Sequence, residues 1–525
     1  MNRRTLLAVG AAGMVSTVAA CTSSSPSSPA ASSSLTFDKN AFTEKTTTVT
    51  TVAGDKEVVY RLYSKVAYVA KPVDVACQSL SVAVPVKIDG KEVDATNAPI
   101  LFEIPVGGYM PAETPEDPFV QAGGMPGGGM PGGGMPGGAG MPSGAPDGGG
   151  PPGGNTGNGG ALPTGMGSTG QNTHEAIAAG WVVVTVGARG RTNKAADGTF
   201  YGKAPAVIVD LKAAVRYIRS NKGVFPGDTD KIISDGTSAG GAVSTLLGAS
   251  GDSDLYSKYL TEAGAADASD AIFGVAAYCP ITDLENADTA YEFLYGSLPA
   301  NGQSVDATVS AELSGAFAAY QDGLAVKGLD GKTLTAGGYR NYLLTQYLQP
   351  AATTYLAGLS SAERSEYLAA NGFIKWSGGK ATFTFADFLT HLGSRKKTVP
   401  AFDAFDLSAG ENNLFGTATV DNRHFTGFSA AKASADLDAD IPDLLKLMNP
   451  MHFLLERNEA RAKNWFIRLG TSDTDTSLTV SSNVAAAAST LGDTVDSIMY
   501  WDAGHGANND PEAFVAWGNK ITGHA

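Results

Sequence analysis

The chain has 525 residues, of which 43% are hydrophobic and 17% charged, so it is long and apolar enough for a large globular domain that carries an insertion. Its formal net charge of −15 makes nucleic acid a poor partner, because an acidic surface repels phosphate groups. The low charged content is typical of a protein that works outside the cell.

The N-terminus has the pattern of a bacterial export signal. Arg3 and Arg4 precede an apolar run that is too short to span a bilayer, and the arginine pair is typical of twin-arginine export. The sequence Val-Ala-Ala-Cys that ends at Cys21 resembles a lipobox. We therefore expect residues 1–21 to be a signal peptide, Cys21 to be lipidated, and residues 22–44 to form a Ser/Pro-rich tether. Ordinary cleavage just before Cys21, with release of the protein, is the alternative.

Residues 45–283 are predicted to form the first part of a sheet-based core. The apolar or alternating runs 58–69 and 78–88 are typical of strands. Pro85 predicts an edge position for the second run, because proline cannot donate to a strand ladder.

A low-complexity stretch interrupts this part of the chain. Residues 122–170 are rich in Gly, Met and Pro, and Met-Pro-Gly-Gly recurs from Met125, Met130 and Met135. Such a composition buries too little apolar surface to offset its chain entropy, so we expect a disordered loop. The regularly spaced methionines would also fit a soft-metal site, but flexible filler is the favoured interpretation.

A Gly-flanked serine stands between a predicted strand and a predicted helix. Ile232 and Ile233 end the strand, and Gly-Thr-Ser-Ala-Gly follows with Ser238 at its centre. This G-x-S-x-G arrangement is typical of the nucleophile elbow of α/β-hydrolases, in which the serine occupies a strained turn above the sheet. The alternative is an ordinary glycine-rich turn.

The same fold places two backbone N–H donors beside the serine to stabilise an oxyanion. The residue after the nucleophile is Ala239, which supplies the first donor. Gly107 and Gly108 follow the predicted strand 100–105 and are candidates for the second, since glycine permits a close backbone approach. A plain turn is the alternative for this pair.

The pattern becomes helical after the predicted strand 272–278. We expect residues 284–442 to form a large helical lid domain inserted after the sixth strand of a mostly parallel sheet. Within it, Ser360 and Glu363 predict a capping box. Two cysteines, Cys77 and Cys279, remain after the signal; both lie in apolar runs, which favours buried thiols over a bridge.

Residues 443–525 are predicted to complete the core and to supply the partners of the serine. A serine nucleophile needs a base and an acid that orients it, in the chain order Ser, acid, His. His505 is the histidine that follows a terminal strand in a Gly-flanked loop. The acid is Asp473 or Asp475, and Asp473 is preferred because it lies nearer the strand end; helix capping is the alternative for both.

These motifs together resemble bacterial tannases, secreted or surface α/β-hydrolases that cleave galloyl esters. The resemblance rests on the elbow 236–241, the run Ala277–Leu284, the Asp473-x-Asp475 pair and Gly504-His505, and it extends from residue 45 to the end of the chain apart from the Gly-rich loop. It implies Ser238, Asp473 and His505 as a catalytic triad.

The resemblance also implies a galloyl-binding set. Lys397, Glu411 and Asp475 would bind the phenolic hydroxyls, and Ile281 would pack on the ring. Taken alone, Lys397 belongs to a basic run that would normally be solvated, Glu411 is unremarkable, and Ile281 fits plain core packing. Gly410 stands where the family has a proline, and loss of that ring contact would loosen the grip on substrate.

We therefore expect an exported serine esterase, either lipid-anchored on the outer face of the cytoplasmic membrane or secreted, that acts on small galloyl esters without a cofactor. No His/Asp/Glu cluster has the spacing of a metal site. The alternatives are a feruloyl or general carboxylesterase, and a catalytically silent surface binding protein on a hydrolase fold. The sequence gives no oligomeric state.

Overall fold

The computed structural model describes residues 34–120, 168–300, 302 and 304–524. The signal, the lipidation residue Cys21, residues 22–33 of the tether and residues 122–167 of the Gly/Met/Pro-rich stretch lie outside the described residues. The last residues predicted for that stretch, 168–170, open a helix.

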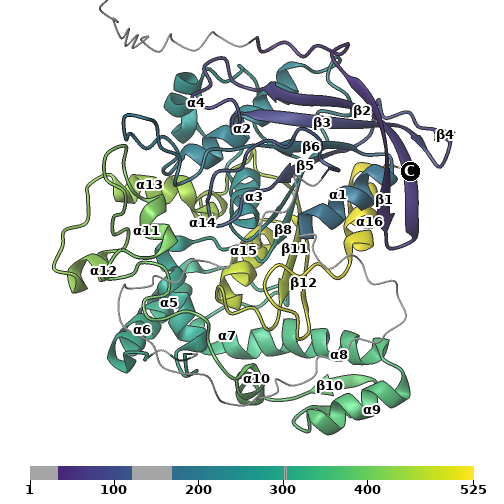
Figure 1. The fold of residues 1–525 in the computed structure, drawn as a ribbon. Coiled ribbons are helices and arrows are strands. Elements are labelled where there is room, and N and C mark those ends of the chain that lie inside the picture. The colour runs from purple at the N-terminus through teal and green to yellow at the C-terminus, as the bar shows by residue number, and fades with distance from the viewer. Residues whose placement is uncertain (1–33, 121–167, 301, 303, 525) are drawn as a thin grey trace, which may run out of the picture. The chain divides into compact units, whose positions relative to one another are not determined.

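A ten-stranded mixed sheet forms the centre of the described chain (Figure 1). Its order is β1-β2-β3-β6-β5-β7-β8-β11-β12, with β4 paired to β3; the six strands from β6 to β12 are mutually parallel, and β1 to β4 pair antiparallel. The strands are β1 Thr43–Thr51, β2 Gly54–Ala67, β3 Ser79–Ile88, β4 Lys91–Glu92, β5 Ile100–Ile104, β6 Val182–Val186, β7 Ile232–Thr237, β8 Gly274–Tyr278, β11 Asn464–Gly470 and β12 Thr494–Tyr500.

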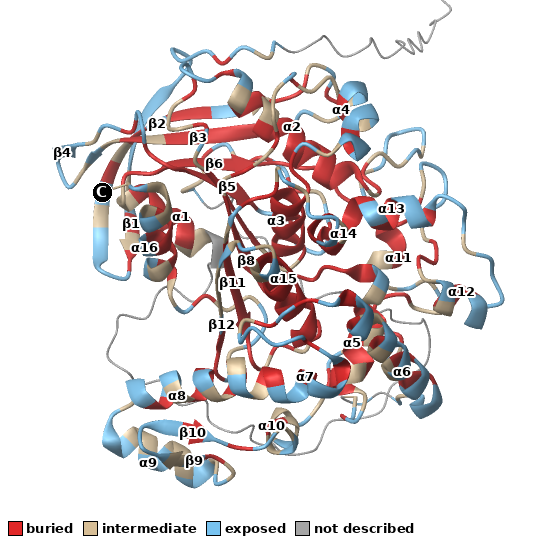
Figure 2. Cartoon of the chain, turned by 180° about the vertical axis from the view of Figure 1, so that it is seen from behind, coloured by how far each residue is buried: buried red, intermediate tan, exposed pale blue. Residues whose placement is uncertain are grey.

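Helices cover both faces of the sheet, and this explains why its central strands are buried and largely apolar. All five residues of β6 and of β5 are buried, as expected for parallel strands with helices on both sides (Figure 2). The helices packed on the core strands are α1 Ser168–Ala178, α2 Ala206–Ser220, α3 Ala239–Ala249, α15 Leu478–Thr490 and α16 Pro511–Thr522, with a short 3-10 turn Asp254–Tyr256 and α4 Ser257–Ala263 after α3.

A mainly helical segment enters between β8 and β11. Its elements are α5 Leu284–Tyr295, α6 Ala307–Leu324, α7 Ala336–Leu343, a π-helical turn Leu344–Leu348, α8 Gln349–Gly358, α9 Ser361–Ala370, the hairpin β9 Lys375–Ser377 and β10 Lys380–Thr382, α10 Phe385–Leu392, α11 Gly410–Leu414, α12 Gly427–Lys432, α13 Ile441–Met448 and α14 Pro450–Leu455. The capping box of α9 is confirmed: the N–H of Glu363 donates to Ser360 Oγ at 3.3 Å, and the N–H of Ser360 donates to Glu363 Oε2 at 2.9 Å.

At the N-terminal side of the sheet, Phe37 is buried between Tyr63 and Phe225, and β1 starts at Thr43. One expectation about this part of the sheet is wrong. Pro85 lies on an internal strand rather than an edge strand. The ladder of β3 with β6 spans only residues 80–83, so the missing N–H of Pro85 costs no hydrogen bond there, and its pairing with β2 falls at a register shift.

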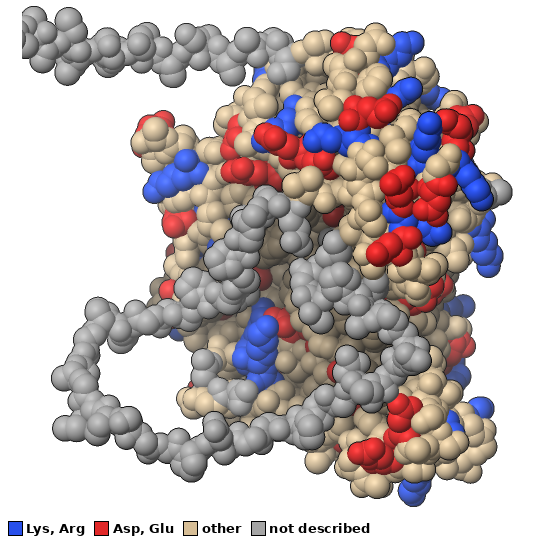
Figure 3. Space-filling model, turned by 45° about the vertical axis from the view of Figure 1, so that its right-hand side comes forward, with Lys and Arg blue, Asp and Glu red and all other residues tan. Residues whose placement is uncertain are grey.

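Other properties of the described residues follow the sequence. Cys77 and Cys279 are buried free thiols, as predicted. No helix in the described part of the chain combines the length and hydropathy of a membrane span. Figure 3 shows acidic and basic side chains next to one another on the face that it presents, so the charge there is mixed rather than of one sign.

One close contact between a helix and the sheet gives a stability prediction. A Cβ at Gly518 of α16 would lie 2.0 Å from the ring of Trp181, whereas a Cβ at Gly315 of α6 would meet nothing within 4 Å. Gly518→Ala should lower the free energy of unfolding by about 1–3 kcal/mol through overpacking. Gly315→Ala, an equally helical position, should leave it unchanged or raise it by about 0.5–1 kcal/mol. Urea titration of both variants checks the difference, and equal stabilities would contradict it.

Candidate active site

The turn between β7 and α3 holds Ser238 in a strained conformation. Its φ of 61° lies in the left-handed region, which side chains other than glycine rarely adopt. The N–H of Ser238 donates to the Tyr278 carbonyl at 2.9 Å, which ties the turn to β8. A Cβ on Gly236 would lie 2.3 Å from the Gly240 carbonyl oxygen, so a side chain there would force the turn open.

Ser238, His505 and Asp473 form one hydrogen-bonded row, although they are far apart in sequence. His505 Nε2 lies 2.9 Å from Ser238 Oγ, and His505 Nδ1 lies 2.8 Å from Asp473 Oδ2. The Asp473 carboxylate is completely buried, whereas 26% of the imidazole is exposed. A base with its orienting acid behind it and a hydroxyl in front can remove the hydroxyl proton and later return it.

The electrostatic environment makes His505 a stronger base than an ordinary histidine. Desolvation lowers its pKa, but the hydrogen bonds to Asp473 and Cys279 outweigh that effect and raise the pKa above its usual value. The buried carboxylate stabilises the imidazolium form, which is the form needed after the Ser238 proton has been taken.

The two predicted oxyanion segments approach each other at the start of α3, which follows Ser238 directly. Ala239 opens α3, and the first N–H groups of a helix have no acceptor within it. The chain after β5 passes against the same helix end, because a Cβ on Gly240 would lie 2.8 Å from the Val106 carbonyl oxygen. Gly107 and Gly108 follow directly, and the Gly108 carbonyl accepts a hydrogen bond from Arg191 Nε at 2.9 Å, which fixes this loop.

Two tyrosines of α5 position the loop that carries the acid. Tyr295 Oη donates to the Asp473 carbonyl at 3.0 Å, and Tyr291 Oη donates to the Thr474 carbonyl at 2.8 Å. The N–H of Asp475 donates to Asp473 Oδ1 at 2.8 Å, which satisfies the carboxylate oxygen that His505 does not use. The loop is therefore held by the inserted helical segment as well as by the sheet.

Asp475 faces the imidazole from the side, and its partner is Lys396. Its Oδ2 lies 3.9 Å from His505 Nδ1, and both of its oxygens accept from Lys396 Nζ, at 2.7 and 2.9 Å. Lys397, which the family resemblance implies as a galloyl-binding residue, places its ammonium 3.6 Å from the centre of the Phe402 ring. The three side chains of the run Arg395-Lys396-Lys397 have different partners, which are Glu292, Asp475 and the Phe402 ring. No pattern in the sequence predicts which of these basic residues contacts which partner.

A buried ion pair fixes the backbone of these lysines. Arg395 and Glu292 are both fully buried and form a two-pronged pair, one bond of which spans 2.6 Å from Nη1 to Oε2. The same guanidinium donates to the Lys397 carbonyl at 2.8 Å. Removing either partner would leave an unpaired buried charge, so the pair holds the lysine loop in one position.

The other two residues of the predicted galloyl-binding set, Ile281 and Glu411, lie beside the loop that follows β5. The N–H of Ile281 donates to the Ser238 carbonyl at 3.3 Å, and the Ile281 carbonyl accepts from Tyr109 Oη at 3.0 Å. Glu411 lies in the first turn of α11, and burial together with the Glu411 charge raises the pKa of Tyr109. At the neighbouring Gly410, the Arg191 guanidinium occupies the space where a side chain would begin: a Cβ would lie 3.2 Å from its Nη2.

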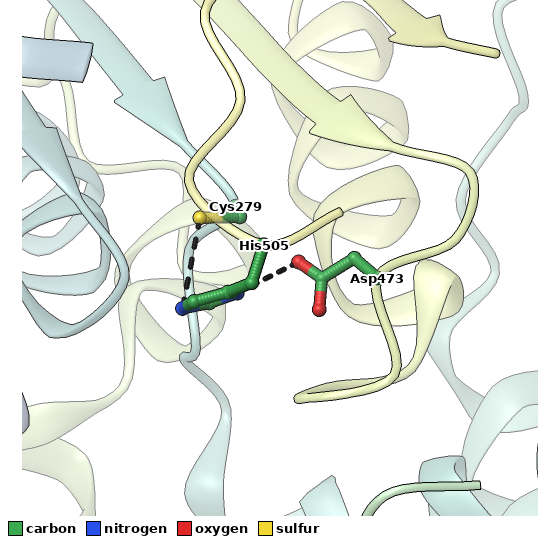
Figure 4. A group of neighbouring side chains, drawn as sticks. All are labelled: Cys279, Asp473 and His505. Atoms are coloured by element: carbon green, nitrogen blue, oxygen red, sulfur yellow. Dashed lines mark hydrogen bonds and ion pairs between the residues drawn. The ribbon is translucent and has the colours of Figure 1, made fainter. Parts of the chain in front are cut away.

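Cys279 also lies at this site, which sequence reasoning did not predict. Its Sγ lies 3.9 Å from His505 Nε2, on the opposite side of the ring from Asp473 (Figure 4). Among the described residues, Cys279, Asp473 and His505 form a group whose possible metal-ligand atoms all lie within 4.8 Å of one another. The sequence could not have predicted the contact of Cys279 with His505, because a buried cysteine after a strand is common and does not indicate a site.

Known proteins share this architecture. A family model described as BD-FAE matches residues 158–314. The native tannin acyl hydrolase of Lactobacillus plantarum is 32% identical with a TM-score of 0.76, and the match covers 93% of this chain and 99% of that chain. A tannin acyl hydrolase solved in complex with ethyl gallate is 32% identical with a TM-score of 0.75, over 93% and 99%. The tannase of Fusobacterium nucleatum is 32% identical with a TM-score of 0.72, over the same shares. A comparison with curated protein sequences found no match.

The basicity of His505 can be measured directly. Asp473→Asn should lower the His505 pKa, because a neutral amide no longer stabilises the imidazolium, and NMR titration of the imidazole protons reports it. Asp475→Asn serves as the matched control: its carboxylate lies 3.9 Å from Nδ1 rather than 2.8 Å, so the fall should be smaller. An unchanged His505 pKa in Asp473→Asn would rule out the proposed source of the shift.

Proposed function

This chain belongs to the tannase family of carboxylic ester hydrolases, and from that premise we propose that it hydrolyses galloyl esters through an acyl-enzyme on Ser238. The observation that carries the proposal is the row Ser238–His505–Asp473, with distances of 2.9 and 2.8 Å. A relative of 32% identity has been solved with ethyl gallate, which supports galloyl esters as the substrate class.

The first half of the reaction transfers the acyl group to the enzyme. His505 Nε2 takes the proton of Ser238 Oγ while this oxygen attacks the ester carbonyl carbon. The carbonyl oxygen becomes an oxyanion, which the N–H of Ala239 and an N–H of the Gly107–Gly108 loop stabilise. Collapse of the intermediate breaks the bond to the alcohol oxygen, and the alcohol leaves with the proton from His505 Nε2.

The second half returns the enzyme to its starting state. Water gives a proton to His505 Nε2 and attacks the acyl carbon, and a second oxyanion forms in the same place. Collapse releases gallate, and the proton on Nε2 returns to Ser238 Oγ. Asp473 stays ionised throughout and holds the imidazole in the tautomer that faces the serine.

The phenolic hydroxyls of the acyl group provide the specificity in this proposal. Asp475 is 7% exposed and lies beside His505, so it can accept a hydrogen bond from a ring hydroxyl, while Glu411 accepts from the other side and Ile281 packs on the ring. A lysine completes the set of residues that bind the phenolic hydroxyls. We assign this role to Lys396, because its ammonium contacts Asp475. An ester without these hydroxyls would forgo these hydrogen bonds, which lowers its rate.

The inserted segment, residues 284–442, is proposed as the lid over this site. Support comes from Asp502, three residues before His505, whose carboxylate accepts from Tyr367 of α9 and from His391 Nε2 of α10 at 2.7 Å. Slower hydrogen exchange in α10 when gallate is bound would support the lid, and unchanged exchange would contradict it.

The N-terminal signal leads us to propose export and a lipid anchor at Cys21. Incorporation of labelled palmitate in the wild type but not in Cys21→Ala tests the anchor. Incorporation in both would reject it.

Ser238→Ala should reduce methyl gallate hydrolysis by about 10⁶-fold, because the nucleophile is gone. The wild type should react with a fluorophosphonate at Ser238, which an unactivated serine on a silent binding protein would not do. A substrate panel decides the ester class: methyl gallate should be preferred to methyl ferulate and nitrophenyl acetate. Preference for either of the latter would replace the galloyl assignment with a feruloyl or general esterase.

The two adjacent lysines form a matched pair for a second test. Lys396→Met should lower kcat/KM for methyl gallate by about 10- to 100-fold, the range expected for loss of a charged hydrogen bond, and should change methyl benzoate little. Lys397→Met keeps the Lys396–Asp475 contact and should have the smaller effect. The reverse ranking would assign the role to Lys397.

A further inference from the structure

The thiol of Cys279 and the imidazole of His505 are arranged as two ligands of a soft metal ion. Cys279 Sγ lies 3.9 Å from His505 Nε2 (Figure 4). A tetrahedral ion with a metal–sulfur distance of about 2.3 Å and a metal–nitrogen distance of about 2.0–2.1 Å separates the two ligand atoms by about 3.6 Å. The observed separation therefore needs to shorten only slightly to hold an ion between them.

The third member of the group supplies the support that metal-binding histidines require. A histidine that ligates a metal almost always donates its other ring N–H to a carboxylate or carbonyl. His505 Nδ1 lies 2.8 Å from the completely buried carboxylate of Asp473. This contact fixes the ring orientation and presents the Nε2 lone pair toward Cys279 Sγ and Ser238 Oγ.

The backbone holds the thiol in this position. Cys279 has a φ of 39°, in the left-handed region that disfavours side chains, and its N–H donates to the Arg468 carbonyl at 2.7 Å. The side chain is buried, but the neighbouring imidazole is 26% exposed, so an ion can reach the pair from the side of Ser238. Strain of this kind concentrates at functional sites.

We propose that Cys279 Sγ and His505 Nε2 bind a thiophilic divalent cation, such as Zn²⁺ or Cd²⁺, and that binding switches the esterase off. The Nε2 atom that would hold the ion is the atom 2.9 Å from Ser238 Oγ. An ion there occupies the lone pair that accepts the Ser238 proton, and water fills the remaining coordination positions. On binding, the thiol loses its proton to solvent, and so does the imidazolium Nε2 when His505 is protonated. The inhibitory effect rests on the proposed function, whereas the binding itself does not.

Cadmium binding tests the site without any assay of turnover. Addition of Cd²⁺ to the purified full chain should produce the ultraviolet thiolate-to-cadmium absorption at one ion per chain. Cys279→Ser should lose this absorption. Cys77→Ser is the matched control, because Cys77 is also a buried free thiol and its pKa is raised to about 12 by burial and by the nearby Asp74. Both variants keep Cys21, so its contribution cancels.

Inhibition of methyl gallate hydrolysis by Zn²⁺ tests whether metal binding at this site switches the esterase off. The Zn²⁺ concentration that halves methyl gallate hydrolysis should rise at least about 100-fold in Cys279→Ser, since loss of a direct ligand costs more than the 10- to 100-fold loss for an orienting partner. Cys77→Ser should match the wild type. Unchanged Cd²⁺ absorption or an unchanged Zn²⁺ sensitivity in Cys279→Ser would overturn the proposal.

Two further variants cover the case in which Cys279→Ser does not fold. Ser238→Ala keeps both ligands and should still show the cadmium absorption, and His505→Ala should bind Cd²⁺ more weakly. Absence of the absorption from Ser238→Ala would overturn the site. A chain that binds Cd²⁺ but does not hydrolyse galloyl esters refutes only the proposed function; one that hydrolyses them but gives no absorption refutes only this inference.

Discussion

The contact between the His505 imidazole and the buried Asp473 carboxylate is the interaction on which the site depends. It spans 2.8 Å and sets the basicity, the tautomer and the orientation of the ring at once. Without it, the strained serine would have no base, and the thiol of Cys279 would have no fixed partner. The same contact therefore underlies both the proposed catalysis and the proposed inhibition by soft metals.

The rest of the fold can be understood as support for this contact from two directions. The parallel strands bring Ser238, Cys279, Asp473 and His505 to one edge of the sheet, because each follows the carboxyl end of a strand. The inserted helices then hold the loops from outside: Tyr291 and Tyr295 bind the acid loop, and the buried Arg395–Glu292 pair fixes the lysines. The residues proposed for substrate recognition and the residues that set the basicity of His505 thus share the same supports.

The features that could be predicted from the sequence alone are those determined by local sequence patterns. The elbow at Ser238, the strands around it and the capping box at Ser360 are set by short patterns of glycine, β-branched and capping residues, and these were predicted. The pairing of His505 with Asp473 rather than Asp475 followed from chain order and strand ends. Contacts decided by packing could not be predicted, such as the burial of Phe37, the pairing of Lys396 with Asp475, and the approach of Cys279 to His505.

The most direct test of the account is to trap the acyl-enzyme. The wild-type chain is mixed with methyl gallate, quenched in acid within the first turnover, digested and examined by mass spectrometry. The account predicts a galloyl ester on the peptide that contains Ser238. A galloyl group on Cys279 or on any other side chain, or rapid hydrolysis with no covalent adduct, would contradict it.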